Sequence, residues 1–300
     1  MPLVVDAERQ RPENASLVIG PAAMPSEFLC RHGGRHLYGE SLGSGAPLIF
    51  CHGNPGNCRV WGDLPRALAP RFRVIVYDRY GYDRSGKPAF DGLAVLQRHS
   101  EDLRAIIDEV GNGRAHVVGW SVGGAIAQLT AAKYPDKVAG LVLLAPLGPT
   151  YRSPRPDVLE RCARHPLGFR LIMAGLSMSL LRRKLVRRGL VDAFAPQPVS
   201  DDWVEVFARL YGDADTVRTV VHENASLAPE TLSDLRPIGR ALILHGDGDR
   251  VVPLEVSEHL ASIGPSATFI KIPGHGHAVH LTASRFVADE IRQFLISSAW

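Results

Sequence analysis

Six short apolar segments recur along this 300-residue chain, and they constrain its fold more than any other feature of the sequence. Most are rich in valine, isoleucine and leucine, and they alternate with glycine-containing turns and helical stretches. Continuous apolar strands of this kind are typical of a parallel sheet that helices cover on both faces. We therefore predict an α/β fold, with strands near residues 47–51, 72–77, 116–119, 138–144, 241–244 and 268–272.

The alternation stops after residue 146 and resumes near residue 236, which divides the chain into separate structural units. Residues 26–146 and 236–300 are expected to form the sheet domain. Residues 147–235 contain several helix candidates and no good strand. Residues 1–25 mix charge, proline and alanine without a helical or strand period. We predict a mobile N-terminal arm and one sheet domain with a helical insertion.

Composition and charge argue against several classes of protein. The net charge of +3, from 34 basic and 31 acidic residues, lacks the concentrated basic excess that is typical of nucleic-acid binding. The four cysteines form no C-x-x-C pair and have no metal-like spacing with histidine. No export signal is visible, so a cytoplasmic location is expected. The longest nearly apolar window, 167–181, is shorter than the ~20 residues that span a bilayer.

Residues 119–124, with the sequence GWSVGG, directly follow one predicted strand and precede a predicted helix. A strand-to-helix turn this sharp needs glycine at the flanking positions, and it lifts the Ser121 hydroxyl out of the sheet. The amide end of the following helix favours developing negative charge. A serine hydroxyl is a poor nucleophile at pH 7 and needs a base that is itself held by a carboxylate.

In this context the segment resembles the nucleophile elbow of the α/β-hydrolase superfamily, and the resemblance extends over about residues 28–296. It implies a mostly parallel central sheet flanked by helices, with a helical cap inserted after the sixth strand. Residues 52–56, HGNPG, resemble the superfamily's loop that supplies half of the oxyanion hole. By that resemblance, the backbone amides of Asn54 and Val122 are the oxyanion donors.

The resemblance also assigns an acid. Residues 245–253, HGDGDRVVP, resemble the family's acid loop, in which the catalytic carboxylate comes three residues after glycine and four before proline. This spacing favours Asp249. Asp247 lies closer to the strand end and is expected to cap the loop by binding backbone amides.

Three histidines lie close together before the last predicted helix, and the family's glycine-histidine pattern selects His277 as the base. Ser121, Asp249 and His277 then follow the chain order of the superfamily. A metal site formed by His275, His277 and His280 is an alternative, although no accompanying ligand motif supports it. We expect neither a metal nor an organic cofactor.

The insertion is expected to cover the active site, because relatives carry a helical cap at this point of the chain. Part of its apolar surface would then face the ligand, which favours a medium-sized hydrophobic acyl or alcohol group. The candidate substrate contacts are Trp120, Leu176, Phe194 and Trp203.

The segment 182–188 holds five arginine or lysine residues. It could dock on an anionic membrane as the polar face of an amphipathic helix. However, residues 152–188 carry ten basic and two acidic residues, whereas residues 192–234 carry two basic and nine acidic residues. We therefore expect the two halves of the insertion to pair with each other rather than with a membrane.

Together these residues predict a serine hydrolase that cleaves a carboxylic ester or a lactone. Serine at position 121 argues against haloalkane dehalogenases and epoxide hydrolases of this fold, which carry aspartate at the elbow. A serine-dependent C–C bond hydrolase and a cofactor-free perhydrolase or haloperoxidase stay open, because they share the triad. The non-enzymatic alternative is a receptor-like protein on the same fold that binds its ligand without turnover. The oligomeric state also stays open.

Overall fold

A computed structural model of the chain describes residues 4–6, 25–87, 95–152, 162 and 164–296. Within these ranges a nine-stranded sheet forms the centre of the molecule, in the order β1-β9-β8-β7-β6-β4-β5-β3-β2. Among the described strands, the pairs β2–β3 and β3–β5 are antiparallel, and all other pairs are parallel. The predicted α/β class with a mostly parallel sheet is thus confirmed. The strands are β1 (Val4–Asp6), β2 (Ser26–His32), β3 (Arg35–Leu42), β4 (Ala46–Cys51), β5 (Phe72–Tyr77), β6 (Ala115–Trp120), β7 (Val138–Leu144), β8 (Arg240–Gly246) and β9 (Ser266–Ile272).

The central strands are buried on both faces, which explains why they are visible in the sequence. Every residue of β6 is buried, and β4 and β8 are buried except at their first residues. Their registers place Cys51 of β4 opposite Gly119 of β6, and Leu144 of β7 opposite Leu244 of β8. The loops that follow these strands therefore leave the same edge of the sheet, where ligands bind in open α/β sheets.

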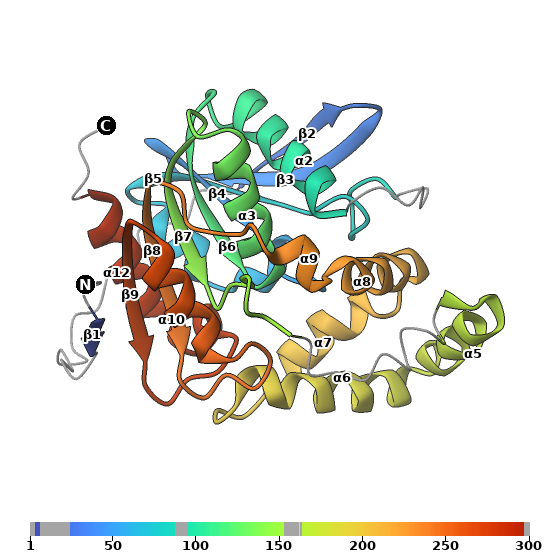
Figure 1. The fold of residues 1–300 in the computed structure, drawn as a ribbon. Helices are drawn as coiled ribbons and strands as arrows, with labels where there is room; N and C mark the ends of the chain where they lie inside the picture. The colour runs from blue at the N-terminus through green and yellow to red at the C-terminus, as the bar shows by residue number, and fades with distance from the viewer. Residues whose placement is uncertain (1–3, 7–24, 88–94, 153–161, 163, 297–300) are drawn as a thin grey trace.

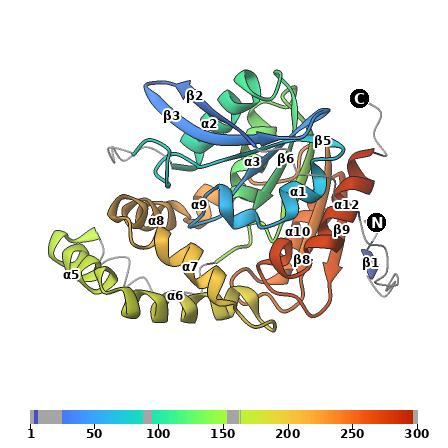
Figure 2. The same cartoon turned by 180° about the vertical axis from the view of Figure 1, so that it is seen from behind.

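Helices cover both faces of the sheet (Figures 1 and 2). On one face, α2, α3 and α10 pack against the strands, and on the other face α1 and α12 do so. The two apolar cores lie between these helices and the sheet. The elements are η1 (Cys58–Trp61), α1 (Leu64–Leu68), α2 (Val95–Glu109), α3 (Val122–Lys133), α10 (Leu254–Ile263), α11 (Val279–Thr282) and α12 (Ser284–Ile296).

The helical insertion lies between β7 and β8 of the described chain. Ser200 and Asp213 begin two of its helices, since their side chains accept hydrogen bonds from the amides of Trp203 and Thr216. Its helices are α5 (Pro166–Ser177), α6 (Ser179–Phe194), α7 (Asp201–Leu210), α8 (Ala214–Ser226) and α9 (Pro229–Leu232).

The predicted pairing between the basic and acidic halves of the insertion is confirmed for two residues of α6. Arg183 lies 2.9 Å from Glu205, and Arg187 forms an ion pair with Asp201. Both acidic partners belong to α7. In both views α5 and α6 lie along the outer side of the insertion, away from the sheet (Figures 1 and 2).

The apolar window 167–181 is divided between α5 and α6, because α5 ends at Ser177 and α6 begins at Ser179. In the portion of the chain that the structure describes, no helix combines the length and the apolar character that a membrane span requires.

Of the predicted N-terminal arm, residues 4–6 and 25 are described, and Val4–Asp6 form β1, which pairs in parallel with β9 at the edge of the sheet. The sequence analysis does not predict this strand, because three residues are too few to show a period. Residues 1–3 and 7–24 of the arm lie outside the described residues, and the mobility of the arm stays a prediction.

Candidate active site

Ser121 lies at the junction of β6 and α3, with a φ of 56° and a ψ of −121°. A positive φ is strained for a residue with a side chain, so close packing must maintain it. A Cβ atom at Gly123 would lie 2.0 Å from the carbonyl oxygen of Cys51, and one at Gly119 would lie 2.5 Å from that of Gly123. Both positions therefore require glycine, which is the physical basis of the sequence motif.

The loop after β4 lies directly against this turn. A Cβ atom at Gly53 would lie 3.1 Å from Cβ of Ser121, so the loop backbone contacts the serine side chain. Asn54 follows Gly53, and Val122 is the first residue of α3, where amides lack intrahelical acceptors. The structure thus places both candidate oxyanion residues beside Ser121. Their role as donors stays a prediction.

Asp249 and His277 form the acid–base pair that the family pattern selects. Oδ2 of Asp249 lies 2.7 Å from Nδ1 of His277 and 2.9 Å from Nε2 of His245. Its Oδ1 accepts hydrogen bonds from the amides of Val251 and Val252, at 2.7 and 2.9 Å. These four contacts fix the carboxylate and leave the Nε2 edge of His277 for another partner. Among the described residues, no hydrogen bond joins His277 to the Ser121 hydroxyl.

Asp247 has a different environment from Asp249. Its Oδ1 accepts a hydrogen bond from the amide of Gly274 at 2.7 Å, which ties its loop to the one after β9. The structure therefore brings Asp249, and not Asp247, to His277. Asp247 binds a backbone amide, as predicted, but this amide belongs to the neighbouring loop and not to its own.

The electrostatics of Asp249 favour a charged carboxylate. Burial by itself would raise its pKa, but electrostatic attraction to the His277 imidazole and the hydrogen bonds from His245 and His277 outweigh burial and hold the pKa well below its usual range. Asp249 is therefore ionised at neutral pH, as a residue that orients an imidazole and stabilises its protonated form must be.

The remaining nearby histidines bind separate partners. Nδ1 of His275 lies 2.9 Å from the Thr282 hydroxyl, and Nε2 of His280 lies 3.1 Å from the Val60 carbonyl oxygen. Burial lowers the pKa of His280 to about 3. Over the residues that the structure describes, no group of three histidine, cysteine or acidic side chains has metal-binding geometry.

Comparison with known proteins establishes the family. Residues 46–284 match the model of the alpha/beta hydrolase fold family, which is more than half of the chain. This chain belongs to the α/β-hydrolase fold family. It is 30% identical over 281 residues to the dihydrolipoyllysine-residue acetyltransferase component of the acetoin cleaving system of Pseudomonas putida. The aligned region covers 92% of this chain and 70% of that protein.

Two further relatives cover most of both chains. This α/β hydrolase is 27% identical over 255 residues to a pimeloyl-[acyl-carrier protein] methyl ester esterase of Nitrosomonas europaea. The aligned region covers 81% of this chain and 93% of that protein. It also matches the crystal structure of an α/β hydrolase fold protein from Burkholderia ambifaria, with a TM-score of 0.72 and 26% identity. That match covers 89% of this chain and 96% of the other.

Trp120 holds the loop that carries the histidine of this α/β hydrolase. Its indole N–H donates a hydrogen bond of 3.0 Å to the carbonyl oxygen of His277, and the two rings lie 5.4 Å apart. Trp120 is only 5% exposed, and its ring also packs on Trp61 and His280. The structure thus gives Trp120 a contact with His277. Its predicted contact with substrate stays a prediction.

The end of α6 binds the same histidine loop. The amide of Ala278 donates a hydrogen bond of 2.9 Å to the carbonyl oxygen of Ala193, and the Gln197 side chain donates one of 2.6 Å to that of Gly274. A Cβ atom at Gly276 would lie 2.3 Å from the carbonyl oxygen of Ala195. The insertion is therefore in contact with the predicted site of the α/β hydrolase.

The predicted substrate contacts of the insertion lie in two different places. Phe194, at the end of α6, is buried, and its ring lies 6.4 Å from that of half-buried Trp203. Leu176 is half-buried on α5, which lies far from the sheet in both views (Figures 1 and 2). Phe194 and Trp203 belong to the part of the insertion near the histidine loop, whereas Leu176 does not.

A buried charged network, which no sequence pattern predicts, joins α8 to the core. The guanidinium group of Arg79 binds both carboxylate oxygens of Glu223, and each side chain is fully buried. The Tyr82 hydroxyl donates a hydrogen bond of 2.7 Å to Glu223, and Nε2 of His99 lies 2.8 Å from it. Burial by itself would raise the pKa of Glu223, but Arg79 and His99 hold it well below its usual range.

This network also contacts the loop of the candidate oxyanion residue. Arg79 donates a hydrogen bond of 2.9 Å to the carbonyl oxygen of Gly53, and the Asn54 side chain donates one of 3.0 Å to Asn224 of α8. Arg79 lies in the loop that directly follows β5. Nothing near Glu223 in the sequence forms a motif, so only the fold reveals the pair.

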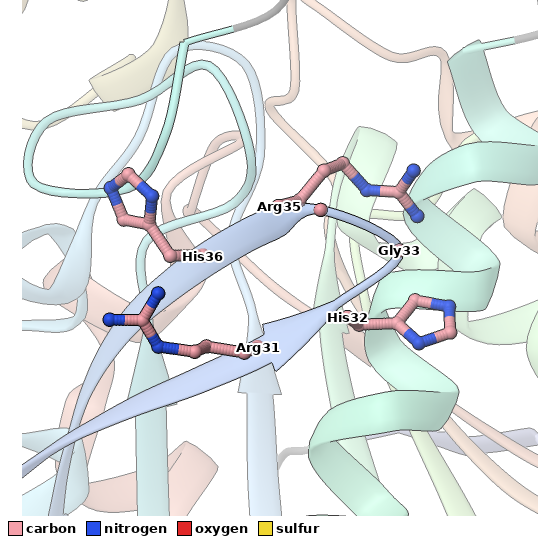
Figure 3. A pocket seen from close by; sticks show the side chains of 6 residues that line it. Arg31, His32, Gly33, Arg35 and His36 are labelled. Atoms are coloured by element: carbon pink, nitrogen blue, oxygen red, sulfur yellow. The ribbon is translucent and has the colours of Figure 1, made fainter.

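Two cavities in the described residues lie outside the predicted site. One of ≈ 170 Å³ is lined by residues 31–36 at the turn between β2 and β3. Figure 3 shows Arg31 and His36 on one side of this hairpin, and His32 and Arg35 on the other. A second cavity, of ≈ 660 Å³, lies between α7 and the loops that follow β4 and β5. Charged side chains line both cavities, unlike an apolar substrate site.

Proposed function

We propose that this α/β hydrolase is a serine hydrolase that cleaves a carboxylic ester or lactone through an acyl-enzyme on Ser121. The observation that carries this proposal is the 2.7 Å pair of Asp249 and His277, together with the strained elbow that presents Ser121. The relative from Nitrosomonas europaea, which is named a methyl ester esterase, supports an ester as the substrate.

In the proposed reaction, Nε2 of His277 takes the proton of the Ser121 hydroxyl while the serine oxygen attacks the substrate carbonyl. The amides of Asn54 and Val122 stabilise the negative oxygen of the tetrahedral intermediate, which is worth about 3 kcal/mol per donor. His277 then protonates the leaving alcohol, and the acyl-enzyme forms. Water, activated by the same imidazole, releases the acid and restores the serine.

Asp249 supports both steps in this proposal. Its charge is held 2.7 Å from Nδ1 of His277, so the proton of the neutral ring lies on Nδ1 and Nε2 is free to accept. When His277 takes the serine proton, the carboxylate stabilises the imidazolium. The hydrogen bond between Ser121 and His277 must form during the reaction, as catalytic hydrogen bonds often shorten only in the Michaelis complex.

We further infer that the acyl or alcohol part of the substrate is apolar and of medium size. Phe194 and Trp203 support this, because both lie in the part of the insertion that contacts the histidine loop. A series of p-nitrophenyl esters tests the inference. We expect kcat/KM to rise from acetate to medium chain lengths, and a preference for acetate or for charged acyl groups would contradict it.

Active-site labelling tests the proposed mechanism. A fluorophosphonate should modify Ser121 in the wild-type chain, and Ser121→Ala should lose both the label and esterase activity, roughly 10⁶-fold in kcat. Ser85→Ala is the matched control, since its hydroxyl lies in the loop after β5 and is buried against Asp78. Full esterase activity in Ser121→Ala would reject the mechanism. Product analysis separates ester hydrolysis from C–C cleavage and perhydrolysis.

A further inference from the structure

The outer side of the insertion exposes an unusual number of large apolar side chains. Seven of the ten large apolar residues that are exposed in the described chain lie between Leu167 and Val191, on α5, α6 and the junction between them. Leu180 is 83% exposed and Leu171 is 74% exposed. A concentration of this kind marks an interaction surface, because scattered exposed leucines are normal and clustered ones are not. We call this cluster the α5–α6 face, and it comprises Leu167, Leu171, Met178, Leu180, Leu181, Leu185 and Val191.

Helix α6 has apolar residues on two sides, and only one of these sides is buried in the fold. Val186, Leu190 and Phe194 follow one another at intervals of four residues and are buried. At 100° per residue, the exposed Leu181 and Leu185 lie on the opposite side of the helix, and Leu180 and Val191 lie about a quarter turn from the buried row. The exposed residues on that side are therefore not required to pack α6 against the rest of the protein.

Cations lie among these leucines. Arg183 and Arg187 face α7, where they pair with Glu205 and Asp201. Around the helix, Lys184 and Arg188 fall between these two pairs of exposed apolar residues. Both are exposed, and neither forms an ion pair with any residue that the structure describes. The expected internal pairing therefore accounts for Arg183 and Arg187 but leaves Lys184 and Arg188 facing outward.

We propose that the α5–α6 face docks on an anionic lipid bilayer. Leucines beside lysine and arginine on one side of a helix are the combination that lies in the membrane interface, with the apolar groups below the headgroups and the cations among them. This proposal replaces the sequence-based expectation that membrane contact is disfavoured, because the exposure of the leucines is visible only in the structure.

Charge complementarity favours a membrane over a second copy of the chain. A two-fold contact centred on this part of the face would bring the cations Lys184 and Arg188 of one copy close to those of the other. Like charges in a buried contact cost several kcal/mol. An anionic bilayer instead pairs each cation with a phosphate or carboxylate and accepts the leucines.

Docking of the α5–α6 face would affect catalysis, because this face belongs to the same helix that binds the histidine loop. The outer side of α6 would contact the lipid, while its C-terminal end binds the histidine loop through Ala193 and Ala278. Docking would hold that loop close to the lipid surface, where apolar esters partition. This step rests on the proposed ester hydrolysis, whereas docking itself does not.

Vesicle cosedimentation of the full-length protein tests docking. We expect binding to phosphatidylcholine vesicles that contain about one third phosphatidylserine, and much weaker binding to pure phosphatidylcholine. The double variant Lys184→Gln/Arg188→Gln should bind the anionic vesicles about 30-fold more weakly, because each cation near an anionic surface is worth about 1 kcal/mol. Leu171→Ser/Leu180→Ser should weaken binding at least about tenfold.

Matched controls on the core domain separate docking from general effects. Leu29→Ser removes an exposed leucine of β2, and Arg66→Gln/Arg71→Gln removes two exposed cations near α1. Both controls should bind vesicles as the wild type does, and circular dichroism should show that all variants are folded.

Absence of wild-type binding at low salt, or equal losses of vesicle binding in the controls, would overturn the proposal. So would a dimer in sedimentation that Leu171→Ser/Leu180→Ser dissociates. Hydrolysis of a water-soluble ester should be unchanged in all these variants, so a failure of docking is distinguishable from a failure of the proposed chemistry.

Discussion

At the scale of single residues, Asp249 and Asp247 show how the fold gives two similar side chains different roles. Both lie on the loop after β8, two positions apart. Asp249 binds two backbone amides through Oδ1 and two imidazoles through Oδ2. Asp247 accepts a backbone hydrogen bond from Gly274 on the neighbouring loop. Orientation of the histidine therefore depends on Asp249, while Asp247 contributes to the stability of the loops.

Substitution Asp249→Asn should lower kcat for a soluble ester roughly 10³- to 10⁴-fold. The amide cannot stabilise a protonated His277, and its NH₂ group favours the wrong tautomer of the ring. The variant should remain folded, since its carbonyl oxygen can still accept from Val251 and Val252. Steady-state kinetics and thermal unfolding check both expectations.

The control for this prediction is Asp247→Asn on the same loop. It should keep kcat within a few-fold of the wild type and change stability by less than about 1 kcal/mol, because its carbonyl oxygen can still accept the hydrogen bond from Gly274. Equal losses of kcat in the two variants would show that the assignment of the acid is wrong.

At the scale of elements, α8 connects the insertion to the core through the buried pair of Arg79 and Glu223. Charges that are removed from water are costly unless they are paired and hydrogen-bonded. Here Tyr82 and His99 also contact the carboxylate, and Arg79 also binds the carbonyl oxygen of Gly53. The network therefore fixes α8 relative to the loop that carries the candidate oxyanion residue.

Substitution Glu223→Gln should lower the free energy of unfolding by about 3 to 5 kcal/mol, because it leaves the guanidinium group of Arg79 buried without a counter-charge. Glu230→Gln on α9 is the matched control, since Glu230 is exposed, and it should change stability by less than about 0.5 kcal/mol. Urea unfolding measures both variants.

A second variant distinguishes a charge effect from a loss of packing. Arg79→Met/Glu223→Leu removes both charges and should recover much of the stability that Glu223→Gln loses. Two outcomes would contradict this account of the buried charge pair. One is a free energy of unfolding of Glu223→Gln within about 1 kcal/mol of the wild type, and the other is a double variant that is less stable than Glu223→Gln.

The same elements show what the sequence could and could not predict. The buried strands, the GWSVGG elbow and the insertion have local signatures, because strand burial, turn sterics and helical periodicity depend on residues close in sequence. The pair of Arg79 and Glu223 joins residues 144 positions apart, and no local pattern specifies it. For the same reason, the exposure of Leu171 and Leu180 was not predictable. The sequence pattern of an apolar helical face does not show whether another element covers that face.

At the scale of the whole molecule, several buried histidines have lowered pKa values. Burial lowers the pKa of His280 to about 3 and that of His116 to about 4. Burial and the nearby charge of Arg79 hold the pKa of His52 well below its ordinary value. In the unfolded chain these imidazoles have ordinary pKa values, near 6.5. Below that pH the unfolded chain therefore binds protons that the folded chain does not.

Stability should consequently fall as the pH decreases from 7 to 5. The free energy of unfolding decreases wherever the unfolded state binds more protons, so each histidine that stays neutral in the fold contributes a loss of about 2 kcal/mol across this interval. The lowered pKa values of Asp249 and Glu223 add no loss there, because unfolded carboxylates take up protons only near pH 4 and below. Urea unfolding at pH 7, 6 and 5 measures the slope.

His280→Asn isolates one contribution to this slope. The variant should be less stable than the wild type at pH 7, because it disturbs the packing with Trp61 and Trp120, but it should lose about 2 kcal/mol less between pH 7 and pH 5. His165→Asn, at an exposed position before α5, should keep the wild-type slope. A slope in His280→Asn as steep as that of the wild type would mean that this imidazole takes up its proton without unfolding, and the acid sensitivity would then have to come from His52 and His116.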